Sequence, residues 1–322
     1  MAKIQLTLLK YLGSWLAPGG RRGKLSILIY HRVLPGPDPM RPGEVDAATF
    51  NWHMQLLAHY FRILPLTLAL RLLREGNLPT RAVCVTFDDG YADNLEVALP
   101  ILQAWNIPAT FFIATGYLNG GRMWNDTVIE ALRYLPAGIL DLSEQGLGIY
   151  HLGGQQERAD AALRLIQLLK YLPFQQREEQ VHYLTSLVSA PLPDKLMLSA
   201  QQVRELHMAG MEIGAHTVNH PILTRLDKTA AQWEIATSKR YLEELIEQEV
   251  KLFAYPNGRP GQDYLPEHVQ MVRESGFVAA VSTAWGGVTL QTDLWQLPRF
   301  TPWDARPDRF MARLVWNYWL ER

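Results

Sequence analysis

At 322 residues, with 48% hydrophobic and 20% charged side chains, the chain has the composition of a globular protein, which excludes a disordered or fibrous one. Its 31 basic and 32 acidic residues are interspersed and give a net charge of -1, so the sequence predicts no nucleic-acid partner. The single cysteine, Cys84, excludes an internal disulfide.

The first 24 residues are predicted to form an amphipathic helix that precedes the main domain. Ile4, Leu8, Leu12 and Trp15 recur at helical spacing. Lys10 interrupts the apolar stretch, so neither a signal peptide nor a membrane span is well formed. The helix is expected to pack on the domain, with peripheral contact to a membrane surface as the alternative. This pattern favours a cytoplasmic location, at a membrane surface under that alternative.

From residue 25 onward, short β-rich runs alternate with amphipathic segments of helical length. The predicted strands are residues 25–30, 61–64, 82–87, 109–114, 211–215, 251–255 and 277–281. The predicted helices are residues 47–60, 93–104, 199–208, 229–248 and 266–274, with a last helix that begins at Pro307.

The predicted strands lack strict alternation of apolar and polar residues, which is typical of strands buried on both faces of a parallel sheet. About seven such units favour a closed barrel over an open sheet. Residues 131–198 are interpreted as helical hairpins without a strand, inserted into the barrel. The sequence therefore predicts an α/β barrel over residues 25–322 that carries a helical insertion.

Polar residues follow three of the predicted strands. Asp88 and Asp89 follow the run 82–87, His216 and His220 follow the run 211–215, and His31 follows the first strand. In a barrel of parallel strands these ends converge on one mouth, where active sites form. Taken alone, the Asp-Asp-Gly sequence could be turn chemistry and the histidine pair could be incidental. Together, two histidines and one carboxylate can hold a divalent ion with positions open for water and substrate.

The segments Thr86-Phe-Asp-Asp-Gly90 and His216-Thr-Val-Asn-His220 resemble the first two motifs of the polysaccharide deacetylase family, also called NodB homology or carbohydrate esterase 4. The resemblance extends from about Leu25 to Arg299 and implies a distorted (β/α)7 barrel. It also implies that Asp89, His216 and His220 bind a metal, usually Zn²⁺, while Asp88 is the general base. The segments 29–32 and 253–258 resemble the branch that acts on exported polysaccharides such as poly-N-acetylglucosamine.

The sequence departs from the family pattern at two places. Ala254 stands where the third motif usually carries an arginine that steadies the catalytic aspartate. Arg299 could supply that guanidinium from a neighbouring strand, or it could be a surface arginine at a strand end. No histidine follows His268, so the usual C-terminal histidine is missing. By elimination His31 is predicted to be the general acid, with a structural imidazole at a strand end as the alternative.

Aromatic and polar residues in predicted loops are candidates for binding sugar, because sugar rings stack on aromatic faces. The aromatic candidates are Tyr91, Tyr117, Trp124, Trp285 and Trp303, and packing in the core is the alternative for each. The predicted substrate residues are Tyr91, Trp124, Asn125, Asp126, Tyr255, Pro256 and Asn257.

These features predict a metal-dependent deacetylase that removes the N-acetyl group of an amino sugar in a polysaccharide. One alternative is a polysaccharide-binding protein on a scaffold that has lost catalysis, although Asp88 argues against it, because binding does not need a second carboxylate beside a metal ligand. The other alternative is a deacylase of a lipid-linked amino sugar.

Overall fold

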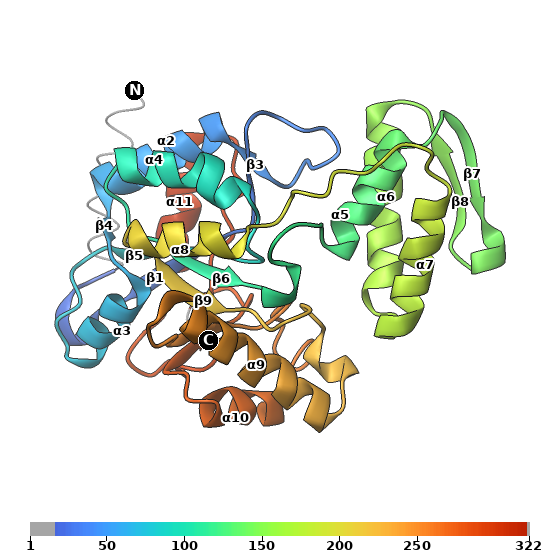
Figure 1. Ribbon diagram of the computed structural model, residues 1–322. Coiled ribbons are helices and arrows are strands. Elements are labelled where there is room, and N and C mark those ends of the chain that lie inside the picture. Colours follow the sequence, from blue (N-terminus) through green and yellow to red (C-terminus); the bar gives the residue numbers. More distant parts are fainter. Residues whose placement is uncertain (1–16, 321–322) are drawn as a thin grey trace.

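The computed structural model describes residues 17–320, and a parallel sheet forms its centre (Figure 1). The strands run in the order β1-β5-β6-β9-β10-β11, and β4 pairs with the first residues of β5. They are β1 (Leu25–Tyr30), β4 (Arg62–Ile63), β5 (Ala82–Phe87), β6 (Thr110–Ile113), β9 (Glu212–Ala215), β10 (Leu252–Ala254) and β11 (Ala279–Val281). All of the predicted strands are confirmed, and β1 and β5 are buried along their whole length.

Residues 297–300 connect the two edges of this sheet. Leu297 forms a parallel bridge with Val281 of β11, and Phe300 forms one with Leu28 of β1. The backbone N–H of Phe300 donates to Ile27 at 2.7 Å. The sheet is therefore curled into a half-barrel, in agreement with the α/β barrel predicted from the strands and with the distorted (β/α)7 barrel that the family resemblance implied.

Helices cover the outside of the curled sheet (Figure 1). They are α2 (Ala47–Tyr60), α3 (Leu66–Arg74), α4 (Leu99–Ala104), α8 (Ala200–Met208), α9 (Lys228–Ile246), α10 (Pro266–Glu274) and α11 (Pro307–Asn317). Side chains cap several of them: Asp46 accepts a hydrogen bond from the Thr49 N–H, and Ser199 begins α8 with a capping box. The sequence prediction missed α3 and did not foresee that the helix predicted for 93–104 begins as a π-helical turn at Asn94–Ala98.

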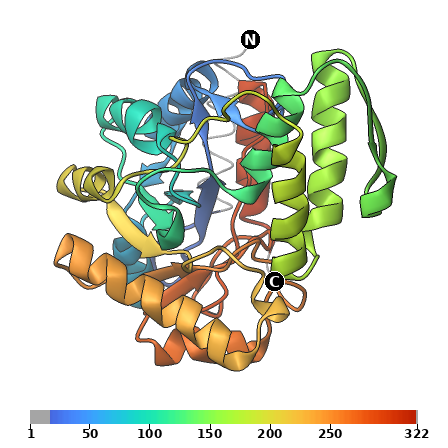
Figure 2. The same cartoon turned by 45° about the vertical axis from the view of Figure 1, so that its right-hand side comes forward.

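The insertion stands beside the barrel and has a hydrophobic core of its own (Figure 2). It contains α5 (Trp124–Tyr134), α6 (Gln155–Lys170) and α7 (Phe174–Ser186), together with an antiparallel hairpin of β7 (Gly138–Leu142) and β8 (Gly148–Leu152). The prediction of an insertion without strands is therefore wrong. Leu140, Leu142, Tyr150 and Leu152 alternate with exposed residues and pack on α5 and α6.

The described chain contains further short elements, and it contains no helix long and apolar enough to cross a membrane. The short elements are β2 (Val33–Leu34), β3 (Val45–Asp46) and the 3-10 helices Gly20–Arg22, Thr115–Tyr117, Ser143–Gln145 and Leu223–Arg225. The amphipathic helix predicted for the first 24 residues falls mostly on residues 1–16, which lie outside the described residues.

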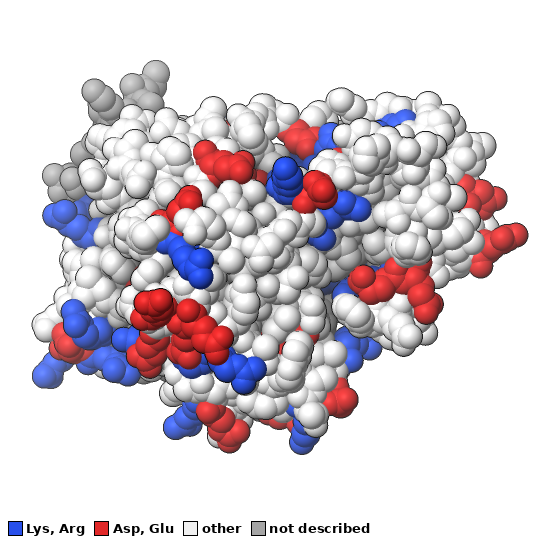
Figure 3. Space-filling model, in the orientation of Figure 1, with Lys and Arg blue, Asp and Glu red and all other residues white. Residues whose placement is uncertain are grey.

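Over the face drawn in Figure 3, basic and acidic side chains are interspersed.

Candidate active site

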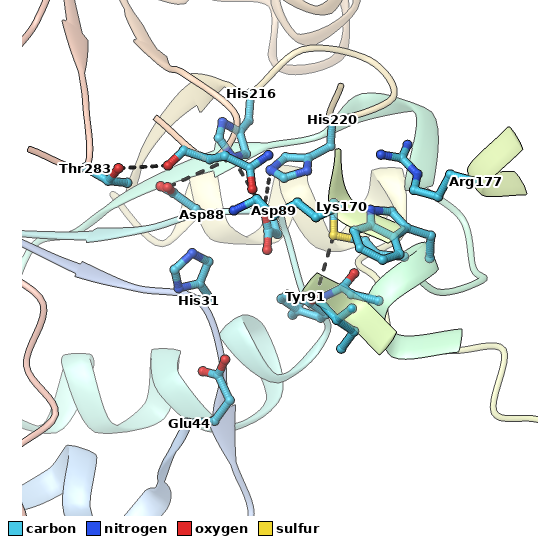
Figure 4. Close-up of a pocket in the computed structure, with 15 residues that line it drawn as sticks. His31, Glu44, Asp88, Asp89, Tyr91, Lys170, Arg177, His216, His220 and Thr283 are labelled. Atoms are coloured by element: carbon cyan, nitrogen blue, oxygen red, sulfur yellow. Dashed lines mark hydrogen bonds and ion pairs between the residues drawn. The ribbon is translucent and has the colours of Figure 1, made fainter. Parts of the chain in front are cut away.

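A cavity of about 250 Å³ opens where three parallel strands end (Figure 4). Asp88 and Asp89 follow β5, His216 and His220 follow β9, and His31 follows β1, and all five side chains line the cavity. The Asp88 N–H donates to the Tyr30 carbonyl at 2.9 Å, which places the ends of β1 and β5 side by side. The structure thus brings the predicted catalytic and metal-binding residues to one mouth of the barrel.

Asp89, His216 and His220 form a cluster that fits a divalent ion. Their ligand atoms lie within 4.8 Å of one another, and Asp89 Oδ1 lies 3.4 Å from His216 Nε2 and 3.3 Å from His220 Nε2. Asp89 Oδ1 is buried and accepts no hydrogen bond in the described structure. His216 Nδ1 lies 2.7 Å from the Ala254 carbonyl oxygen, and donation there leaves its Nε2 lone pair free for a metal. Two imidazoles and a carboxylate are a donor set that Zn²⁺ accepts.

The loop that carries the two histidines is held in an unusual backbone conformation. Thr217 and His220 have φ angles of 64° and 51°, in the left-handed region that side-chain-bearing residues rarely adopt. The Thr217 hydroxyl accepts the His220 N–H at 3.1 Å. On α9, the Glu234 carboxylate accepts the N–H groups of Val218 and Asn219 at 2.8 and 2.9 Å. These bonds offset the strain and fix the distance between the two imidazoles.

Burial determines the protonation state of His220. Burial lowers the pKa of His220 to about 3, so its imidazole is neutral near pH 7 and its lone pair is available to a metal ion.

Asp88 is anchored by Arg299 at the bottom of the cavity. The two guanidinium nitrogens Nη1 and Nη2 donate to Oδ1 and Oδ2 at 2.7 and 2.6 Å, and Nε donates to the Ser282 carbonyl at 2.8 Å. Arg299 is 1% exposed, so it is a buried partner and not a surface arginine. Burial alone would raise the pKa of Asp88, but Arg299 and then His216 outweigh it and hold that pKa below its ordinary value.

His31 lies on the opposite side of the cavity from the histidine pair. Its backbone carbonyl accepts the Asn94 side-chain amide at 2.9 Å, while its imidazole faces the cavity above Glu44 (Figure 4). The Glu44 carboxylate accepts the Arg32 N–H at 3.3 Å. Glu44 therefore lies beside the predicted general acid, and burial raises the pKa of its carboxyl above the ordinary value.

The predicted substrate residues divide into two groups. Tyr91, Trp124, Asn125 and Asn257 line the cavity. Asp126 does not line it, because its carboxylate is buried and accepts hydrogen bonds. These come from the Tyr91 hydroxyl at 2.8 Å, from Arg32 at 3.3 Å and from Arg41 at 3.0 Å.

Tyr255 and Pro256 also differ from the prediction. Both are buried, and the Tyr255 ring stacks on Tyr264 with centroids 3.8 Å apart. Neither lines the cavity, so in this segment only Asn257 is placed to contact a substrate.

Several residues that the sequence interpretation did not single out also line the cavity. They are Glu44, Met123, Ile166, Lys170, Arg177 and Thr283. Ile166, Lys170 and Arg177 belong to α6 and α7 of the insertion, whose sequence carries no motif that points to a site. Only the packing of the insertion beside the barrel brings them there.

Comparisons with known proteins agree with this geometry. The sequence profile of the family described as polysaccharide deacetylase matches residues 75–150 and 164–280, more than half of the chain. YxkH of Bacillus subtilis is 23% identical over 278 residues, which are 86% of this chain and 70% of that protein. The poly-beta-1,6-N-acetyl-D-glucosamine N-deacetylase of Staphylococcus epidermidis is 29% identical over 111 residues, 30% of this chain and 38% of that protein.

Among solved structures, the Streptococcus pyogenes deacetylase PplD is similar with a TM-score of 0.62 and 22% identity, covering 91% of this chain and 99% of that one. IcaB from Ammonifex degensii is similar with a TM-score of 0.58 and 19% identity, over 94% and 98% of the two chains. These likenesses support the same barrel. With the family profile matched over most of the barrel, the chain belongs to the polysaccharide deacetylase family, whose members are hydrolases of N-acetyl amide bonds.

Proposed function

We propose that the chain is a metal-dependent N-deacetylase that acts on an N-acetylated amino sugar within a polysaccharide, with Zn²⁺ as the metal. The observation that carries this proposal is the cluster of Asp89, His216 and His220, in which a buried carboxylate oxygen faces two imidazoles without a hydrogen-bond donor. The staphylococcal relatives, named for deacetylation of poly-β-1,6-N-acetyl-D-glucosamine, support a substrate of this class.

Asp88 is the proposed general base. A divalent ion held by the cluster would supply a Lewis acid that makes a water molecule more acidic and polarises the acetamide carbonyl. Asp88 accepts the proton of the attacking water, whose oxygen forms a bond to the carbonyl carbon. Arg299 holds both Asp88 oxygens and therefore keeps the carboxylate ionised and correctly oriented before the reaction.

His31 is the proposed general acid. As the carbon–nitrogen bond breaks, the amide nitrogen takes a proton from the His31 imidazole, and acetate and a free amino sugar are released. The backbone N–H of Asn257, at the cavity wall, is the proposed donor to the negatively charged carbonyl oxygen. His31 and Asp88 lie at the ends of neighbouring strands, so one substrate group can reach both.

Acetate release from β-1,6-linked N-acetylglucosamine oligomers tests the proposal. Wild-type protein should release acetate, a chelator should stop the release, and added Zn²⁺ should restore it. Asp88→Asn should stay inactive with or without Zn²⁺, which controls for a contaminating hydrolase. Release that persists in the presence of chelator would contradict the metal dependence, and no release from any N-acetylated oligomer would contradict the function.

A further inference from the structure

Four arginine side chains are buried in the part of the chain that the structure describes, and three of them contact carboxylates. Arg32, Arg41 and Arg299 donate to aspartate or glutamate oxygens at distances between 2.6 and 3.3 Å. Arg177 is the fourth and is 4% exposed. The nearest carboxylate oxygen that it faces belongs to Glu178, lies 3.9 Å from Nε and sits on an exposed side chain. Arg177 is thus a buried cation without a hydrogen-bonded anion.

Aromatic rings hold the Arg177 guanidinium in place without neutralising it. Its central carbon lies 4.9 Å from the centre of the Trp124 ring and 5.4 Å from that of Phe174. Its Nε and Nη2 donate to no acceptor in the described structure. Burial lowers the pKa of this guanidinium. A buried charge left in this state is costly, and an anion bound beside it would offset that cost.

Arg177 is directed at the reaction site from the insertion. It lines the same cavity as Asp89 and His220, and its guanidinium is turned toward His220 in Figure 4. Three acidic residues of the barrel wall also line this cavity, and none of them forms an ion pair with Arg177. Asp88 is paired with Arg299, Asp89 faces the two histidines, and Glu44 accepts the Arg32 N–H beside His31.

A second cation lies where this cavity meets a neighbouring one of about 620 Å³. Lys170 on α6 lines both cavities and forms no ion pair within 4.0 Å among residues 17–320. The neighbouring cavity is also lined by Arg259 and Trp285, and no acidic side chain is among its lining residues. The buried Asp263 lies close enough to influence Lys170, but it does not reach the lining of either cavity.

We propose that the insertion selects acidic substrates, and that a carboxylate or phosphate group next to the acetylated sugar binds between Arg177 and Lys170. This inference rests on the proposed function and adds its substrate class. A planar guanidinium can donate two parallel hydrogen bonds to either group. The acetamide reacts at the barrel wall, and the anionic group lies at the insertion wall. Trp285 offers an aromatic face for a further sugar in the neighbouring cavity.

Two oligosaccharides of equal length distinguish this selectivity from general deacetylation. One contains only N-acetylglucosamine, and the other alternates N-acetylglucosamine with glucuronic acid. Wild-type kcat/KM, counted per acetylated sugar, should be at least about tenfold higher on the acidic oligomer, since a charge-assisted pair of hydrogen bonds is worth about that factor. Arg177→Gln should lose this preference, and the loss should appear as a higher KM on the acidic oligomer with little change in kcat.

Arg164→Gln is the matched control, because Arg164 is exposed on α6, lines neither cavity and carries the same charge. It should keep the full preference. Equal kcat/KM of the wild type on both oligomers, or an unchanged preference in Arg177→Gln, would overturn a carboxylate-binding role.

A binding measurement keeps the test independent of turnover and of the deacetylase function. The thermal midpoint of the purified protein is recorded with glucuronate, with inorganic phosphate and with neutral glucose, at equal ionic strength. Glucuronate or phosphate should raise it in the wild type and in Arg164→Gln, but not in Arg177→Gln or in Lys170→Gln. A shift with glucuronate assigns the site to acidic sugars, and a shift with phosphate alone assigns it to phosphorylated sugars. Equal shifts in wild type and both cavity variants, or none with either anion, would overturn the anion site even if acetate release is normal.

Discussion

The barrel and the insertion line the same cavity with side chains held in different ways. In the barrel, Asp88 and Asp89 follow β5 and the histidine pair follows β9, so hydrogen-bonded strands set their spacing. In the insertion, Lys170 and Arg177 come from helices that pack around a core of their own. Under the proposed mechanism and the proposed anion site, the reaction depends on the barrel and selectivity depends on the insertion. Substitutions in the two regions should therefore change different quantities.

The largest expected effect is on the barrel side, at Asp88. Asp88→Asn should lower turnover by roughly 10⁴-fold, because an amide cannot accept the proton of the attacking water. The variant also leaves Arg299 buried opposite a neutral group, and loss of one partner from a buried pair costs about 3–5 kcal/mol. Steady-state acetate release and chemical denaturation measure the two quantities. Full metal content with this loss of turnover would support Asp88 as base, whereas lost metal would make it a ligand.

His31→Gln should lower turnover on the amide substrate by roughly 10²- to 10³-fold, since protonation of the leaving nitrogen is lost. Metal content and thermal stability should not change. On an acetate ester with a good leaving group, which needs no proton, the loss should be much smaller. Equal losses on amide and ester would remove His31 from the role of general acid.

A smaller effect on the barrel side is expected when the support of the loop between the two histidines is weakened. Glu234→Gln should lower metal affinity by about tenfold, because residues that orient metal ligands from outside the coordination shell have effects of this size. The carboxylate accepts two backbone N–H groups of that loop, and an amide can place an N–H against them instead. Competition with a calibrated chelator measures the affinity. Glu243→Gln on the same helix is a control, because Glu243 contacts Lys239 and Val250 instead.

The smallest effect on the metal site is expected from the insertion core. Leu165→Ala on α6 should destabilise the insertion by about 2–5 kcal/mol, the usual result of removing a buried leucine side chain. Hydrogen exchange should increase in α5 to α7, while metal affinity stays within twofold. A parallel loss of metal affinity would show that the two regions do not act separately.

The sequence allowed much of the barrel to be predicted, because strands buried on both faces form continuous apolar runs that end in polar residues. β1 and β5 match their predicted bounds for this reason. The hairpin of the insertion was not predicted, because each of its strands places only two apolar side chains inward. An alternation this short is not distinguishable in a sequence from the helical segments around it. The two glycines Gly146 and Gly148 were the signal of its turn in the sequence. In the structure they adopt positive φ angles of 71° and 87°.

Individual site residues were harder to predict where their partners lie far along the chain. Asp126 was expected to contact sugar, yet Arg32 and Arg41 pair with it from about ninety positions away. Arg299 was expected either to steady Asp88 or to lie at the surface, and its contact with Asp88 spans 211 positions. Arg177 carried no local signal at all, because its isolation from carboxylates is a property of the assembled fold.

Metal stoichiometry tests the central claim most directly. Elemental analysis of the purified wild-type chain, of His216→Ala and of His220→Ala should find about one divalent ion per wild-type chain. Each variant should hold almost none at the same free metal concentration, because each has lost one of three protein ligands. Wild-type metal content in both variants, or a wild-type chain that binds no divalent ion when zinc is supplied, would contradict the account.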